Sequence, residues 1–287
     1  MINPLQSPPQ SPRRPARLQW STLFALLVAA CLLLAVTWWW QQGNWPWSRS
    51  DSPVALQSED RFAAHGIDPA ALHIQAWHAL EDFPHDLAQF ETVFWEPQDT
   101  TSLRQWLNSY DRLADSRVLE IGTGTGIIAL LCAQRGAAAV VASDINPQAV
   151  ANTRYNAALM GLAEKIDVRL VAADRPAPFA VIETSEQFDL IISNPPWEDA
   201  AVQEVAAYAL YDPGFQLLDA LLQDSHQFLR PHGRLLLAYG AQVPIQRILA
   251  TAPALGWQVT VRDQRDITAL PKVFVPGVLL ELRRNGS

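Results

Sequence analysis

The run from Val118 to Gly126 constrains the fold of this chain more than any other feature. It reads Val-Leu-Glu-Ile and then Gly-Thr-Gly-Thr-Gly, and the apolar residues that follow, from Ile127 to Cys132, recur at helical spacing. Alternating glycines allow positive φ angles and let a ligand approach the backbone closely. The run therefore predicts a strand, a tight ligand-binding loop and a helix.

A dinucleotide-binding loop has glycine three places after its second glycine, where this chain has Ile127. The run instead resembles motif I of the class I S-adenosylmethionine (SAM) methyltransferases, in which an acid precedes a G-x-G-x-G loop. This resemblance implies SAM as the cofactor, with Glu120 near its ammonium group, directly or through water. It also implies a cofactor-binding loop made of Gly122, Thr123, Gly124, Thr125 and Gly126.

Two further apolar runs end in acids. The run from Ala138 to Ala142 leads to Asp144, and the run from Val168 to Ala172 leads to Asp174. By the same resemblance, Asp144 binds the ribose hydroxyls, Ile145 lies against the adenine and Asp174 holds the adenine amino group. The alternatives are that Asp144 only caps the helix starting near Pro147, and that Asp174 is an ordinary surface acid.

The second motif is Asn194-Pro195-Pro196-Trp197, which follows the buried-looking strand Phe188 to Ser193. It resembles the N-P-P-aromatic loop of N-methyltransferases, whose acceptor nitrogen is a poor nucleophile because its lone pair is delocalised. The resemblance implies that the Asn194 side-chain oxygen and the Pro195 carbonyl accept the two N–H hydrogens and align the lone pair. Asn194 is also predicted to be a cofactor-binding residue. Pro196 stiffens the loop, and Trp197, where Tyr is common, packs on a planar substrate. A plain turn after a strand is the alternative.

The segment from Phe94 to Leu103 resembles the P-R-P-[ED]-T segment of the release-factor glutamine N5-methyltransferases, which makes Thr100 a candidate substrate-binding residue. Asn152 and Asn156 also fall where that group and the related "small domain" RNA methyltransferases have polar residues. The resemblance covers about residues 93–283 and is specific for N-methyltransferases. It does not name the acceptor, since Gln98 stands where the release-factor enzymes have arginine.

The remaining apolar pattern completes an α/β architecture. Helices are expected at 215–229 and 245–255, with strands at 233–239, 257–261 and 278–282. Together with the runs above, they give a doubly wound, seven-stranded, Rossmann-like sheet with helices on both faces and its final strand antiparallel. Two cysteines and six histidines show neither disulfide nor metal-ligand spacing, so no metal site is expected.

The first 60 residues predict a membrane anchor. A Pro/Arg-rich tail (1–19) precedes an apolar segment (20–42) and a polar linker (43–60). The core of that segment, residues 23–40, is long enough to cross a bilayer, and tryptophans stand at both ends. A cleaved signal peptide is the alternative, although no A-x-A-like site follows. Three arginines before the segment and one after it favour a catalytic domain outside. SAM is made in the cytoplasm, which favours the opposite, so a bacterial inner-membrane protein with a cytoplasm-facing domain is a hypothesis.

Residues 61–92 are predicted to form a small helical cap, and residues 93–287 the methyltransferase domain. The apolar positions of the cap, from Ile67 to Phe90, suggest one or two short helices. The cap could form one wall of the substrate site, or it could merely cover an edge of the sheet.

Charge bears on the acceptor. The net charge is −8, and no run of Lys or Arg interleaved with aromatics occurs in the catalytic region, whereas nucleic-acid binding usually rests on a basic surface.

Three hypotheses for the function follow from the sequence. The first is a membrane-anchored SAM-dependent N-methyltransferase of a protein glutamine or similar amide. The second is methylation of an exocyclic amine of adenine or guanine in RNA or DNA. The third is a non-catalytic SAM-binding membrane module that recruits a partner.

Overall fold

The computed structural model of the chain describes residues 62, 65, 67, 72–270 and 274–286. The predicted tail, anchor and linker, residues 1–60, lie outside this part. Within it, no helix is both long and apolar enough to cross a membrane.

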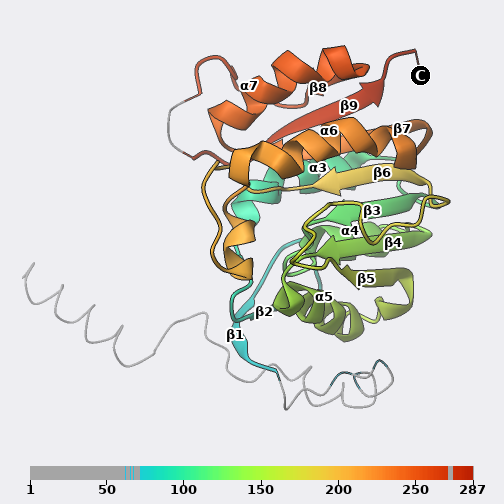
Figure 1. Cartoon of the computed structure of the whole chain (residues 1–287). Helices are drawn as coiled ribbons and strands as arrows, with labels where there is room; N and C mark the ends of the chain where they lie inside the picture. The colour runs from blue at the N-terminus through green and yellow to red at the C-terminus, as the bar shows by residue number, and fades with distance from the viewer. Residues whose placement is uncertain (1–61, 63–64, 66, 68–71, 271–273, 287) are drawn as a thin grey trace, which may run out of the picture. The chain divides into compact units, whose positions relative to one another are not determined.

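A seven-stranded sheet organises the domain (Figure 1). Its spatial order is β5-β4-β3-β6-β7-β9-β8; the first five strands run parallel, and β9 is antiparallel to both of its neighbours. This confirms the predicted Rossmann-like sheet. The strands are β3 (Arg117–Ile121), β4 (Ala139–Asp144), β5 (Ile166–Leu170), β6 (Phe188–Ser193), β7 (Leu229–Tyr239), β8 (Trp257–Val261) and β9 (Val278–Arg284).

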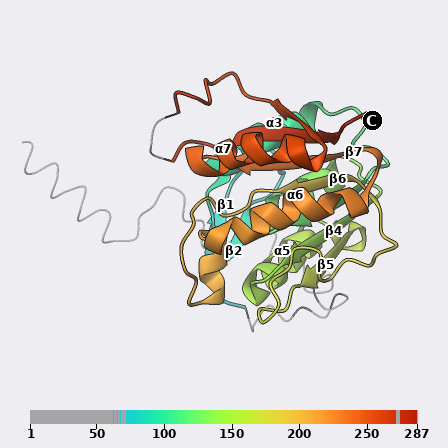
Figure 2. The ribbon, with the colours of Figure 1, turned by 45° about the horizontal axis from the view of Figure 1, so that its top comes forward.

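Helices cover both faces of this sheet. Successive strand residues point to opposite sides: Val118 packs in one buried cluster with helices α3 and α4, and Leu119 in another with α6 and α7. Figures 1 and 2 show α6 and α7 on one side of the sheet and α3 on the other. The α-helices are α3 (Thr101–Ser109), α4 (Ile127–Gln134), α5 (Pro147–Leu159), α6 (Gln216–Phe228) and α7 (Gln242–Thr251). Short 3-10 helices are η3 (Pro97–Thr100), η4 (Ala163–Lys165), η5 (Val205–Ala209), η6 (Pro213–Phe215) and η7 (Ala252–Leu255).

Residues 61–92 were predicted to form a helical cap. From Ile74 onward, where the structure describes every residue of this segment, that prediction is wrong. Strands β1 (Ile74–His78) and β2 (Leu87–Phe90) form an antiparallel pair there. For segments this short, the apolar spacing fits a strand as well as a helix. The deciding contacts come from helix α5, where the buried side chains of Asn152 and Asn156 hydrogen-bond the backbone of β2.

Candidate active site

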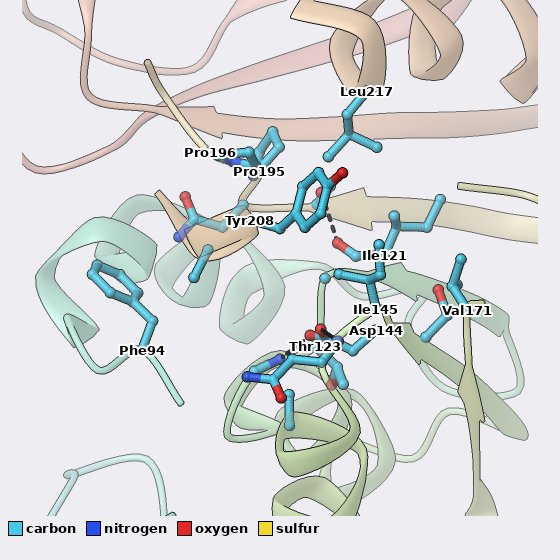
Figure 3. A pocket seen from close by; sticks show the side chains of 18 of the residues that line it. Phe94, Ile121, Thr123, Asp144, Ile145, Val171, Pro195, Pro196, Tyr208 and Leu217 are labelled. Carbon is cyan, nitrogen blue, oxygen red and sulfur yellow. Dashed lines mark hydrogen bonds between the residues drawn. The ribbon is translucent and has the colours of Figure 1, made fainter. Parts of the chain in front are cut away.

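A cavity of about 390 Å³ lies where parallel strands of the sheet end. This edge is the usual ligand site of open α/β sheets, and the volume is within the range of small-molecule sites. Figure 3 shows side chains from several strand ends and loops pointing into it. The predicted site residues that line it are Thr100, Glu120, Gly122, Thr123, Gly124, Thr125, Asp144, Ile145, Asn194, Pro195 and Pro196.

The glycine-rich loop leaves open space on its cavity side. Gly122 and Gly124 have φ of +78° and +56°, and a Cβ built on either would meet nothing within 4 Å. Gly126 differs, because a Cβ there would lie 3.0 Å from Thr153 Cγ2 of α5. The first two glycines therefore make room for a ligand, and the third allows the loop to pack on α5.

Glu120 is a buried acid at the end of β3. Its Oε2 accepts hydrogen bonds from Thr123 Oγ1 at 2.7 Å and from the Ala129 amide at 3.0 Å. Burial raises the pKa of Glu120 to about 8, although these two bonds favour the charged form. Within the described part of the chain, no group hydrogen-bonds to Oε1. That oxygen is left for a cationic group of a ligand.

Asp144 joins the end of β4 to the glycine loop. Its Oδ2 accepts a hydrogen bond from the Gly124 amide at 2.9 Å, and its Oδ1 accepts one from the Asn146 amide at 2.8 Å. Burial raises the pKa of this carboxyl. The N-cap of α5 is Asn146, whose Oδ1 accepts from the Gln148 amide at 2.9 Å. The alternative in which Asp144 only caps the helix is therefore wrong.

These residues fit SAM. The open space beside Gly122 and Gly124 accommodates a ligand, Glu120 offers an oxygen to the ammonium, and Asp144 borders the cavity next to Ile145. Their individual roles in binding SAM stay predictions.

Asn194 carries an unsatisfied polar atom at the edge of this cavity. Its Oδ1 is buried and accepts no hydrogen bond from any described residue. Leaving such an atom unpaired costs about 1–3 kcal/mol, so it needs an explanation. Because the side chain lines the cavity beside Pro195 and Pro196, an N–H group of a ligand is a candidate donor to this oxygen.

Trp197 is not among the residues that line the cavity, and its packing on a planar substrate stays a prediction. Its indole Nε1 donates to the Ala238 carbonyl at 3.3 Å, and its ring lies 5.9 Å from that of Phe274. Gly240 gives the ring its space, because a Cβ there would lie 2.3 Å from it. After two rigid prolines, the chain thus directs this side chain toward β7 and the segment before β9.

Asp174 is also outside the cavity. Strand β5 ends at Leu170, two residues before the predicted end at Ala172, and Asp174 lies exposed in the following turn. The cavity is lined there by Val171 and residues 176–178 instead. The role predicted for Asp174 at the adenine stays a prediction.

The loop after the motif supplies lining residues that sequence analysis missed. Tyr208, Tyr211 and Asp212 all border the cavity. Burial raises the pKa of Asp212, whose carboxylate accepts the backbone amides of Leu217 and Leu218 at the start of α6. The available signal was the placement of two of the chain's five tyrosines three residues apart, close behind the motif.

Comparison with known families agrees with this geometry. The family model described as "Methyltransferase small domain" matches residues 99–262, more than half of the chain. The chain belongs to the methyltransferase small domain family. The prediction of a class I SAM-dependent methyltransferase domain is thereby confirmed, and SAM is its cofactor.

Relatives of this methyltransferase small domain protein act on different acceptors. Release factor glutamine methyltransferase of Cereibacter sphaeroides is 39% identical over 138 residues, covering 43% of this chain and 46% of the relative. The tRNA1(Val) (adenine(37)-N6)-methyltransferase of Parabacteroides distasonis is 32% identical over 123 residues, covering 42% and 50%. The chain thus spans about half the length of these curated relatives.

A solved structure shows the same fold. The SAM dependent methyltransferase from Agrobacterium tumefaciens superposes with a TM-score of 0.50 at 20% identity, covering 75% of this chain and 71% of that one. At this identity the likeness bears on the fold alone.

Proposed function

We propose that this protein transfers a methyl group from SAM to the amide nitrogen of a glutamine-type side chain in a protein. The observation that carries the proposal is the buried Asn194 Oδ1, which lacks a hydrogen-bond donor among the described residues. A primary amide offers two N–H hydrogens, and one of them would satisfy this oxygen. The glutamine methyltransferases among the relatives support the same acceptor class.

The residues that line the cavity have two roles, binding the cofactor and orienting the acceptor. SAM, when bound, supplies a methyl group on a positively charged sulfur. Glu120, the glycine loop and Asp144 hold the cofactor, while Asn194 Oδ1 and the Pro195 carbonyl accept the two N–H hydrogens of the acceptor. These bonds orient the nitrogen lone pair and stabilise the charge that develops on the nitrogen. We assign no general base, because the nitrogen can release its proton to solvent after transfer.

The second candidate is an exocyclic amine of adenine or guanine in RNA or DNA. Such an amine is also planar and carries two N–H hydrogens, and a relative methylates adenine 37 of a tRNA. The net charge of −8 weighs against it, because nucleic-acid binding usually rests on basic surfaces. In a third alternative, a non-catalytic module, the chain binds SAM without transferring its methyl group.

The apolar segment 20–42 supports a further part of the proposal, a single-pass anchor in a bacterial inner membrane with the catalytic domain facing the cytoplasm. A reporter enzyme fused after Ser287 tests this orientation. Activity on the cytoplasmic side is expected, and activity only in the periplasm contradicts it.

Labelled methyl transfer separates the three functions. The purified full chain is incubated with cell lysate and SAM carrying a labelled methyl group, and the labelled product is treated with protease or with nuclease. Label released by protease is the expected result. Label released by nuclease favours the second candidate, and SAM binding without transfer to either class favours the third.

A further inference from the structure

We propose that Asn146 is a positioning residue that holds one wall of the cavity in place and thereby slows the release of SAM. This wall is the segment from Thr92 to Glu96, and all five of its residues line the cavity. The inference goes beyond the proposed function, because it concerns the binding of the cofactor and holds whichever acceptor is methylated.

The side chain of Asn146 connects the wall to helix α5. Its Nδ2 donates to the Thr92 carbonyl at 3.0 Å, while its Oδ1 accepts from the Gln148 amide at 2.9 Å as the N-cap of the helix. The cap fixes which end of the side-chain amide faces the wall, because the exchanged orientation would set its oxygen against the Thr92 carbonyl. Asn146 is buried, so the cavity wall and the helix are joined by a residue shielded from water.

A chain of hydrogen bonds continues from Asn146 to the glycine loop. The backbone amide of Asn146 donates to Asp144 Oδ1 at 2.8 Å, and Asp144 Oδ2 accepts from the Gly124 amide at 2.9 Å. Figure 3 shows Phe94 of the wall, Thr123 of the loop and Asp144 among the side chains that line the cavity. The wall is thereby attached to the loop whose open space accommodates the cofactor, which places its Asn146 end beside SAM.

Thr92 has a backbone conformation that is unfavourable for its residue type. Its φ is +64°, in the left-handed region that β-branched residues rarely occupy. Such a conformation costs free energy and persists only where surrounding contacts hold it. The hydrogen bond from Asn146 Nδ2 to the Thr92 carbonyl is such a contact. Without this bond, Thr92 is free to return to a negative φ, and the residues that follow it in the wall move with it.

The β1–β2 hairpin holds the middle of the wall from the other side. Gln89 Nε2 of β2 donates to the Val93 carbonyl at 2.8 Å, and the Trp95 ring stacks on the ring of His78 of β1 with centroids 4.0 Å apart. These contacts keep the wall on the hairpin, whereas Asn146 attaches it to the cofactor-binding residues. The loss of the Asn146 bond is therefore expected to open the cavity at the cofactor while the hairpin stays folded.

The test compares Asn146→Ser, Thr92→Gly and the double variant in the full chain, with SAM as the probe. Serine still caps α5 but lacks the second polar atom that reaches the wall. The Kd for SAM is measured calorimetrically, and the dissociation rate from the release of labelled SAM into an excess of unlabelled SAM. We expect Asn146→Ser to raise both about five- to tenfold, the effect of one lost hydrogen bond. Glycine adopts a positive φ without strain, so Thr92→Gly should stay within about twofold of wild type and should restore most of the affinity in the double variant.

Recovery in the double variant separates the wall from the helix cap, because a change at position 92 would not repair a defective cap of α5. The inference is overturned if Asn146→Ser binds and releases SAM as wild type does, or if the double variant binds SAM no better than Asn146→Ser. A higher KM for the acceptor with an unchanged Kd for SAM also overturns it, since the wall would then lie on the acceptor side. These SAM measurements need no acceptor, so a protein that binds SAM but methylates neither protein nor nucleic acid fails the proposed function alone.

Discussion

At the scale of single residues, the Glu120 carboxyl group sets how cofactor binding depends on pH. Burial raises its pKa to about 8, and its free oxygen can pair with the SAM ammonium only when the carboxyl is ionised. Below pH 7 the ammonium stays charged, so the ionised fraction of Glu120 limits binding. The Kd for SAM should therefore decrease up to about tenfold between pH 6 and pH 7. Calorimetry on wild type and Glu120→Gln checks this, since the variant should lose the dependence; a wild-type Kd independent of pH contradicts it.

The same carboxyl predicts the opposite trend for the stability of the protein without cofactor. Below about pH 4.5 Glu120 is protonated in the folded and unfolded states alike, and above about pH 8 it is ionised in both. Between these values the folded state holds the extra proton, so the free energy of unfolding falls as pH rises. Urea unfolding of wild type and Glu120→Gln at several pH values isolates this effect. A difference between the two proteins that stays constant with pH would be inconsistent with a buried, protonated Glu120.

A side chain at position 124 is expected to have two effects, a strained backbone and less space for the cofactor, and the variant Gly124→Ala distinguishes them. In Gly124→Ala the new Cβ meets no atom of the described residues within 4 Å, apart from its two chain neighbours, so it enters the open space of the cavity. We expect the Kd for SAM to rise at least tenfold, while stability falls by only about 1–2 kcal/mol from the left-handed φ. Gly286→Ala is the matched control, because Gly286 also has a positive φ with nothing within 4 Å but lies at the end of the chain. Equal SAM affinities in the two variants would exclude Gly124 from the cofactor site.

At the scale of elements, helix α5 holds the β1–β2 pair and the glycine loop together through side-chain amides. Asn156 Oδ1 accepts from the Ala88 amide at 2.9 Å, while its Nδ2 donates to the carbonyls of Ala88 and Thr125, each at 2.9 Å. Asn152 makes a similar pair of bonds to Phe90 and Ala88. Through these side chains of α5, the β1–β2 hairpin is fixed against the glycine loop that lines the cavity.

Asn156→Ala should destabilise the protein by about 2–4 kcal/mol, because it leaves buried backbone groups without partners. Urea unfolding measures this change, and hydrogen exchange at Ala88 should quicken. The control is Asn108→Ala, whose side chain makes an exposed hydrogen bond to Asp82 and should change stability by less than about 0.5 kcal/mol. A loss in Asn156→Ala no larger than in the control would show that the amide bonds to β2 do not hold it.

Elements also differ in how far the sequence alone predicts them. Some elements are predicted by their own residues. A buried apolar run indicates strand β3, alternating glycines indicate the loop, and helical spacing of apolar residues indicates α4. Strand β2 is not predicted in this way, because its conformation depends on amides of α5 more than sixty residues away.

At the scale of the whole molecule, the sheet and the position of the cavity were predictable, since Glu120, Asp144 and Asn194 stand at the ends of three parallel strands and such strands bring their ends to one edge. The sequence predicted less well which side chains face the cavity. Trp197 turns toward Ala238 and Gly240, and Tyr208 lines the cavity from a loop with no clear period. The Trp197 side chain is positioned by a contact between segments 41 residues apart in the sequence.

The most direct test of the proposed function is Asn194→Ala, measured for SAM binding and for methyl transfer to lysate. If Asn194 orients the acceptor nitrogen, the Kd for SAM should stay within about threefold of wild type while the transfer rate falls roughly 100- to 1,000-fold, as when a transition-state hydrogen bond is removed. Transfer at the wild-type rate, or loss of SAM binding in proportion to the loss of transfer, would contradict an acceptor-orienting Asn194.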